Sequence, residues 1–175
     1  MVPFLDLPLF NLIFSVSQNV IFIHPLFYFL GSLMAWILGA WFLFKVLYIK
    51  NFKKKAYILL LSALSIIISR GIITETLRFF VNSPRPFSAL GFDPLIAPPL
   101  TNSMPSGHMA AFVPLAVVMF MMNKRSGIIF SVAVLVMGFA RILLGVHWPT
   151  DILAGIAVGL IGFKIAQMIL PKPSY

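Results

Sequence analysis

The sequence predicts an all-α integral membrane protein: a bundle of five transmembrane helices preceded by an N-terminal amphipathic helix that lies in the membrane interface. Two observations lead to this prediction. Hydrophobic residues make up 61% of the 175 residues, charged residues only 10%, and the mean hydropathy is +1.03. Long apolar runs alternate with short basic clusters, as spans alternate with cytoplasmic loops. Cysteine is absent, which excludes disulfides and thiolate metal ligands.

The N-terminal segment, residues 7–23, is expected to be the interfacial helix. It is short for a span, and polar residues recur along one face at helical spacing: Asn11, Ser15, Gln18 and Asn19. A sixth transmembrane helix is the alternative. No Lys or Arg precedes the apolar run, which argues against a cleaved signal peptide.

Five apolar stretches follow as the predicted spans, and the first, with 19 residues, is long enough to cross about 30 Å of hydrocarbon. They cover residues 26–44, 56–80, 106–122, 127–145 and 150–170. Between the second and the third, residues 81–105 contain six prolines and should form an outer loop rather than a continuous helix. Pro149 suits the first turn of the last helix. The whole chain, residues 1–175, is expected to be a single domain.

The basic residues predict how the bundle is oriented. The lysines between 45 and 55, the pair Lys124-Arg125 and Lys172 fall on one side if every span crosses the membrane, and that side should be the cytoplasm. Residues 81–105 and 146–149 then share the outer side. Because the net charge of +9 follows this topology, nucleic acid is not expected as a partner.

Polar residues gather next to these outer segments. Ionisable groups are costly at membrane depth, so each one near a span is a candidate functional residue. Arg78 ends the second span and Arg85 opens the outer loop. Either could extend its head group to the interface. A guanidinium also matches two phosphate oxygens at once, which makes both candidates for phosphate binding.

The run Pro105-Ser106-Gly107-His108 stands at the start of the third span. Ser106 could simply cap the helix. The same geometry also suits an anion, because the backbone N–H groups at a helix N-terminus are free and the helix dipole assists. Gly107 would let the backbone approach the anion closely, Ser106 could add a hydroxyl donor, and His108 could transfer a proton.

Arg141, His147 and Asp151 form the last motif, with five residues between the first two and three between the last two. A His and an Asp at this spacing are most often a structural pair. Here, however, a buried carboxylate in the first turn of a helix needs a partner. A hydrogen bond from the His147 imidazole to Asp151 would select the tautomer of His147. The same arrangement orients the imidazole in a nucleophile dyad.

These motifs together resemble the type 2 phosphatidic acid phosphatase (PAP2) superfamily of membrane lipid phosphatases. The family pattern is Lys, six residues, Arg-Pro; then Pro-Ser-Gly-His; then Ser-Arg, five residues, His, three residues, Asp. The matching positions in this chain are Arg78, Arg85-Pro86, Pro105 to His108, Ala140-Arg141, His147 and Asp151. Arg78 stands where the family usually has Lys, and Ala140 stands where it has Ser. Neither departure removes a reacting group.

The resemblance implies a catalytic role for three residues. His147 would attack phosphorus to give a phosphohistidine, Asp151 would orient it, and His108 would protonate the leaving oxygen and then activate water. The phosphate would be bound by five other residues: Arg78, Arg85, Ser106, Gly107 and Arg141. No metal or cofactor is expected, because the three arginines would repel a divalent cation.

The implied activity is removal of a phosphate from a lipid headgroup at the outer leaflet of the bacterial inner membrane, with the site facing the periplasm. The chain looks most like bacterial lipid A 1-phosphatases; a phosphatidylglycerophosphate phosphatase and an undecaprenyl pyrophosphate phosphatase are alternatives. A lipid phosphotransferase, or a transporter or anchoring subunit, also stays open. For the transporter, Arg70 and Glu75 could mark an ion path, although local pairing with Arg78 explains them as well. The expected partners are the lipid substrate and the bilayer, and the oligomeric state is open.

Overall fold

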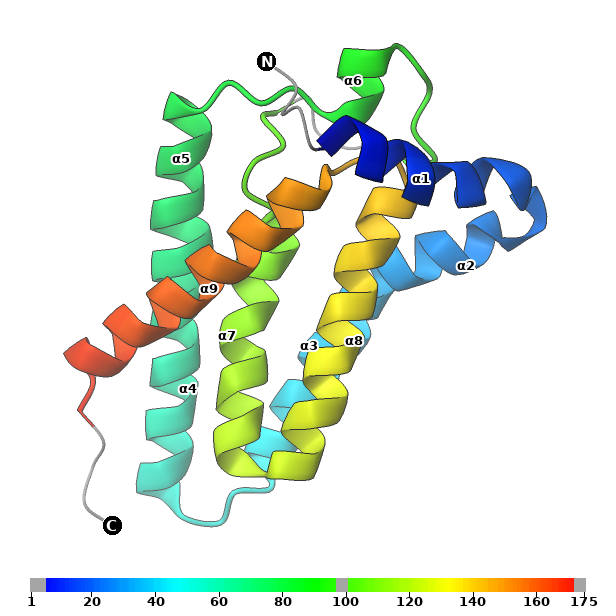
Figure 1. Ribbon diagram of the computed structural model, residues 1–175. Helices are drawn as coiled ribbons and strands as arrows, with labels where there is room; N and C mark the ends of the chain where they lie inside the picture. The colour runs from blue at the N-terminus through cyan, green and yellow to red at the C-terminus, as the bar shows by residue number, and fades with distance from the viewer. Residues whose placement is uncertain (1–5, 97–100, 172–175) are drawn as a thin grey trace.

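The computed structural model of the protein describes residues 6–96 and 101–171, and every regular element among them is helical (Figure 1). The elements in chain order are α1 (Asp6–Asn19), η1 (Ile21–Ile23), α2 (His24–Tyr28), η2 (Phe29–Leu33), α3 (Met34–Leu47), α4 (Phe52–Ile66), η3 (Ile67–Ile73), α5 (Thr74–Phe80), α6 (Pro86–Leu90), α7 (Gly107–Met122), α8 (Lys124–Leu143) and α9 (Pro149–Ile169). The segment η1 is a 3₁₀-helix, and η2 and η3 are π-helical.

Several of these elements join end to end into membrane-spanning helices. Four continuous helices are long and apolar enough to cross a membrane: His24–Leu47, Phe52–Phe80, Lys124–Leu143 and Pro149–Ile169. The helix α7 is shorter and also apolar. Each of the five overlaps one predicted span, so the predicted all-α membrane bundle is confirmed.

Two helices begin earlier than hydropathy predicted, because polar side chains cap them. The Asn51 side chain accepts a hydrogen bond from the backbone N–H of Lys54 at 3.0 Å, and α4 therefore starts at Phe52. Asn123 accepts in the same way from Ser126 at 2.9 Å at the start of α8. Lysines inside these first turns belong to the helix although they are not apolar.

The helix α1 lies across one end of the bundle instead of running along it (Figure 1). It has 14 residues, too few to cross about 30 Å of hydrocarbon. Of the predicted polar stripe, Asn11, Gln18 and Asn19 are exposed. This placement agrees with the interfacial helix and not with a sixth span.

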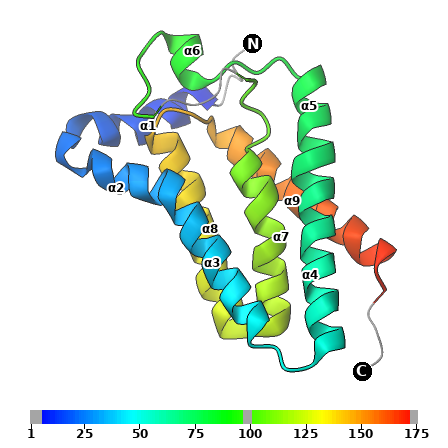
Figure 2. The ribbon, with the colours of Figure 1, turned by 180° about the vertical axis from the view of Figure 1, so that it is seen from behind.

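The helix α7 occupies the middle of the bundle in both views (Figures 1 and 2). Small residues let its neighbours approach closely. A Cβ added to Gly127 of α8 would lie 2.3 Å from Cα of Phe120. Ser69 of η3 donates a hydrogen bond to the Ala110 carbonyl of α7 at 2.7 Å. Close packing of this kind replaces the hydrophobic effect as the force that joins helices in lipid.

The two ends of the bundle differ in charge. The connection between α3 and α4 and the turn between α7 and α8, which carry the basic clusters, lie at the same end (Figure 1). The segments 81–96, 101–106 and 144–148 lie at the opposite end, near α1. The predicted grouping of loops therefore agrees with the structure, while the orientation in the membrane stays a prediction. Lys172 and residues 97–100 of the outer loop lie outside the described residues.

Candidate active site

A polar cavity of about 280 Å³ lies at the loop end of the bundle. Six of the eight predicted site residues line it, and Ser106 and Asp151 lie outside its lining. The lining residues are Arg70, Arg78, Arg85, Gly107, His108, Ala111, Phe112, Arg141 and His147. They come from η3, α5, the outer loop, α7, α8 and the α8–α9 connection. A second cavity, of about 360 Å³ between α7, α8 and α9, is lined almost entirely by apolar side chains. The polar cavity is therefore the candidate active site.

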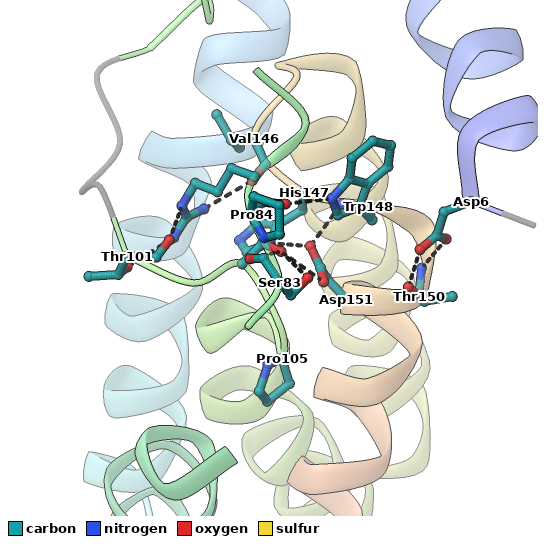
Figure 3. Close-up of polar contacts among 12 residues, drawn as sticks. Asp6, Ser83, Pro84, Thr101, Pro105, Val146, His147, Trp148, Thr150 and Asp151 are labelled. Atoms are coloured by element: carbon teal, nitrogen blue, oxygen red, sulfur yellow. Dashed lines mark hydrogen bonds and ion pairs between the residues drawn. The ribbon is translucent and has the colours of Figure 1, made fainter. Parts of the chain in front are cut away.

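His147 stands in the short segment between α8 and α9, where its side chain is 2% exposed (Figure 3). Its Nδ1 lies 3.1 Å from Oδ2 of Asp151. The same carboxylate accepts from the Trp148 backbone N–H at 2.8 Å, and the Ser103 hydroxyl lies 3.2 Å from its Oδ1. With Asp151 held as an acceptor, the His147 proton stays on Nδ1 and the lone pair on Nε2 is left for chemistry.

Burial also sets the charge of His147. Removal from water, followed by the nearby Arg141 and Arg85, lowers the pKa of His147 well below its ordinary value of 6.5. The ring is therefore neutral near pH 7. A neutral imidazole is the form that can act as a nucleophile.

Arg85 connects the outer loop to the segment that carries His147. Its Nε donates to the Thr101 carbonyl at 3.1 Å, and its Nη1 donates to the Val146 carbonyl at 2.9 Å. Burial, with a smaller contribution from Arg78, lowers the pKa of Arg85 to about 10, so it remains a cation near pH 7. Its Nη2 also lies 3.5 Å from the Thr101 hydroxyl, so all three of its nitrogens have partners within the protein.

Arg78 and Arg141 are held more loosely. Nη2 of Arg78 donates to the Pro105 carbonyl at 3.2 Å, and Nη1 of Arg141 donates to the Gly31 carbonyl of η2 at 3.2 Å. The Nε atom of each is buried and makes no hydrogen bond within the described residues. Buried donors of this kind are costly unless a ligand pairs with them.

Ser106 begins α7 without capping it through its side chain. Its backbone N–H donates to the Asp151 carbonyl at 2.9 Å, which joins the start of α7 to the start of α9. Its hydroxyl is buried and has no partner in the part of the chain that the structure describes. The side-chain cap considered above is therefore not formed, and the hydroxyl is left for a ligand.

Sequence reasoning missed Asp6, which anchors α1 to the site. The backbone N–H of Thr150 donates to Asp6 at 3.0 Å, and the Thr150 hydroxyl donates to the same carboxylate (Figure 3). Phe10 packs on Trp148 with ring centroids 5.0 Å apart, and Nε1 of Trp148 donates to the Pro84 carbonyl at 2.8 Å. Its rarity could have indicated a role, because Asp6 is one of only four acidic residues in the chain.

Arg70 and Glu75 form an ion pair, and Glu75 also lies 3.3 Å from Nη1 of Arg78. The predicted local pairing is thus confirmed. The amino-acid pattern did not reveal that Arg70 also lines the polar cavity.

Comparison with known proteins identifies relatives of this site and fold. A family model described as the PAP2 superfamily matches residues 59–172. The bacitracin transport permease protein BcrC of Bacillus licheniformis is 26% identical over 172 residues, covering 98% of this chain and 83% of that protein. The undecaprenyl-diphosphatase BcrC of Bacillus subtilis is 31% identical over 100 residues, 55% of this chain and 51% of that protein. The crystal structure of Aquifex aeolicus LpxE has a TM-score of 0.72 at 27% identity, covering 95% of this chain and 97% of that one.

Proposed function

The chain belongs to the PAP2 superfamily of membrane phosphatases, and we propose that it removes a phosphate from a membrane lipid through a phosphohistidine on His147. One observation supports this most strongly. The His147–Asp151 pair lines or adjoins a cavity whose walls also hold buried donors without partners in the described chain, namely Nε of Arg78 and Nε of Arg141. A phosphate group would receive hydrogen bonds from those donors while its phosphorus faces the imidazole.

The reaction proceeds in two displacements. Nε2 of His147 attacks phosphorus, the bond to the lipid oxygen breaks, and protonated His108 gives its proton to that oxygen. Neutral His108 then takes a proton from water, and the water attacks the phosphohistidine. Inorganic phosphate leaves, and both histidines return to their starting states. Asp151 stabilises the positive charge on His147 in each transition state.

The charge on the phosphate is balanced by side chains in this proposal. Arg78 and Arg141 line the cavity and would bind the phosphate oxygens, and the buried Ser106 hydroxyl next to the cavity residue Gly107 would add a donor. Arg85 holds the loop against Val146 and adds a positive charge. A divalent cation fits poorly among these guanidinium groups, and Asp151 is already engaged by Trp148 and His147. We therefore expect excess chelator to leave the activity intact, and loss that magnesium restores would contradict it.

The substrate is proposed to be a lipid whose chains stay in the bilayer while its phosphate enters from the outer, periplasmic side of the inner membrane. The cavity lies at the end of the bundle that lacks the basic clusters. Two substrates have separate support. Lipid A 1-phosphate was favoured by the sequence resemblance, and undecaprenyl diphosphate is favoured by the BcrC relative named as its diphosphatase.

The test compares lipid A, phosphatidylglycerophosphate and undecaprenyl diphosphate side by side with the purified protein. Release of inorganic phosphate should be seen with at least one lipid and should disappear in His147→Ala. Brief reaction with a ³²P-labelled substrate should leave acid-labile label on the wild type and none on the variant. Turnover that survives in His147→Ala would exclude this nucleophile. Transfer of phosphate to an added lipid alcohol in place of water would make the protein a phosphotransferase.

A further inference from the structure

Arg70 stands in the cavity beside the residues assigned to phosphate, although the family motifs do not include its position. It lines the cavity together with Arg78, Gly107 and His108. Its side chain is 38% exposed, compared with 13% for Arg78. Arg70 therefore occupies the open side of the cavity, away from the buried imidazole of His147.

The π-helical segment η3 explains how Arg70 comes to face the cavity. In a regular α-helix, residues eight positions apart lie about 80° from each other around the axis, and residues five apart lie about 140° apart. Arg70 and Glu75 are five apart and still form an ion pair, and Glu75 also reaches Arg78. The wider turns of η3 bring the three charges onto one face. Such π segments are frequent at functional sites.

Two neighbours position the Arg70 side chain. A Cβ added to Gly107 would lie 2.6 Å from Nε of Arg70, so the guanidinium lies directly against the first residue of α7, next to His108. Nη1 donates to Glu75, which is its only hydrogen-bond partner within residues 6–96 and 101–171. A guanidinium has five N–H donors, and most of those on Arg70 are therefore available to a ligand.

The position beside His108 is on the side from which the lipid oxygen leaves. A cation there has little to bind if the leaving group is an uncharged alcohol, but it matches a second phosphate joined to the first. We propose that Arg70 is a specificity-determining residue that binds the second phosphate of a lipid diphosphate, so that this chain favours diphosphates over lipid monophosphates. The inference rests on the phosphatase activity proposed above.

The reaction with a diphosphate balances without any further reactant. Nε2 of His147 forms a bond to the terminal phosphorus while the bond from that phosphorus to the bridging oxygen breaks. The electron pair stays on the bridging oxygen, which takes the proton of His108 and leaves as part of a lipid monophosphate anion bound to Arg70. Water then gives a proton to His108 and its oxygen to phosphorus, which frees inorganic phosphate. A phosphate is a weakly basic leaving group, so this route depends on charge more than on a donated proton.

The experiment uses two substrates that share one prenyl chain, farnesyl diphosphate and farnesyl monophosphate, with the purified full-length protein in detergent. Release of inorganic phosphate gives kcat/KM for each. We expect Arg70→Gln to lower kcat/KM for the diphosphate roughly 10- to 100-fold and for the monophosphate less than about threefold. Arg70→Lys should recover part of the loss, because the charge returns without the planar fork. Arg125→Gln removes an exposed cation at the other end of the bundle and should change neither value.

The outcomes separate failure of the Arg70 inference from failure of the phosphatase assignment. Equal losses for both substrates in Arg70→Gln would show that Arg70 only supports the fold, and an unchanged kcat/KM would show that it does not bind substrate; either result overturns the inference and leaves the phosphatase assignment standing. A wild-type protein that releases phosphate from neither prenyl lipid, nor from the three lipids named above, would refute the phosphatase assignment itself.

Discussion

The two walls of the cavity differ in how their polar groups are paired. On one wall, His147 and Asp151 are buried and hydrogen-bonded to each other, and Asp151 is held further by Trp148. On the other wall, Arg78 and Arg141 each keep a buried Nε atom without a partner in the described chain. The first, which we call the fixed wall, has its polar groups paired without a ligand. The second, the donor wall, keeps N–H donors that a ligand could pair with. This division suits the proposed phosphoryl transfer, in which the nucleophile must be aligned and the charge of the phosphate must be bound.

The largest effect should come from breaking the fixed wall at Asp151. In Asp151→Ala, Nδ1 of His147 loses the oxygen that accepts its proton, and the negative charge that stabilises the cationic ring is lost with it. We expect kcat to fall roughly 10³- to 10⁴-fold with little change in KM, a loss comparable to removal of the acid from a serine protease triad. Phosphate release under saturating lipid measures this. If kcat stays within tenfold of wild type while the variant unfolds at the same temperature, alignment by Asp151 is unimportant.

Changes to the donor wall should be smaller and should depend on charge. Arg78→Gln removes a cation that faces the proposed phosphate, and we expect kcat/KM to fall roughly 10- to 100-fold. Arg78→Lys restores the residue type found in the family at this position and should recover most of the loss. Arg125→Gln, far from the cavity, is the matched control. Equal activity of Arg78→Gln and Arg78→Lys would mean that positive charge at this position does not bind the phosphate.

Asp6 supports the fixed wall from outside, so its loss should reduce stability more than chemistry. Asp6→Ala leaves the Thr150 N–H without its acceptor at the start of α9. The expected cost is about 1–2 kcal/mol in the free energy of unfolding, as for loss of a helix cap. Thermal unfolding in detergent measures it, with Asp93→Ala, an exposed acidic residue, for comparison. Identical unfolding temperatures for the two variants would show that α1 is not anchored through Asp6.

An effect of similar size concerns pH and tests whether His147 is buried away from water. The pKa of His147 lies well below 6.5 in the folded protein, so below about pH 6.5 the unfolded chain takes up a proton that the folded chain does not. Stability contributed by this group is therefore lost as the pH falls, by up to about 1.4 kcal/mol per pH unit. Unfolding temperatures of wild type and His147→Gln between pH 5 and 7 measure it. The gap between them should change with pH; parallel curves would mean that His147 titrates normally.

The sequence was sufficient for the parts of the molecule that depend on composition and local spacing. Apolar runs predicted five spans, and the topology of those spans brought the motifs that hold His108, Arg141 and His147 to the same end of the bundle. Asp6 could not be connected to Thr150 by any local pattern, because 144 positions separate them. Arg70 could not be assigned to the cavity for a different reason. Nothing in the local spacing indicates that η3 is π-helical, and its wider turns bring that side chain to the cavity.

The attachment of α1 has one more consequence. An interfacial amphipathic helix lies at the depth where its apolar face contacts the acyl chains and its polar face contacts the headgroups. Asp6 joins α1 to the first turn of α9, so we expect an interfacial α1 to keep the imidazole of His147, next to that turn, level with the headgroup layer. Bilayers of different thickness would displace the far ends of the helices, while the reacting nitrogen would stay at the height where lipid phosphates lie.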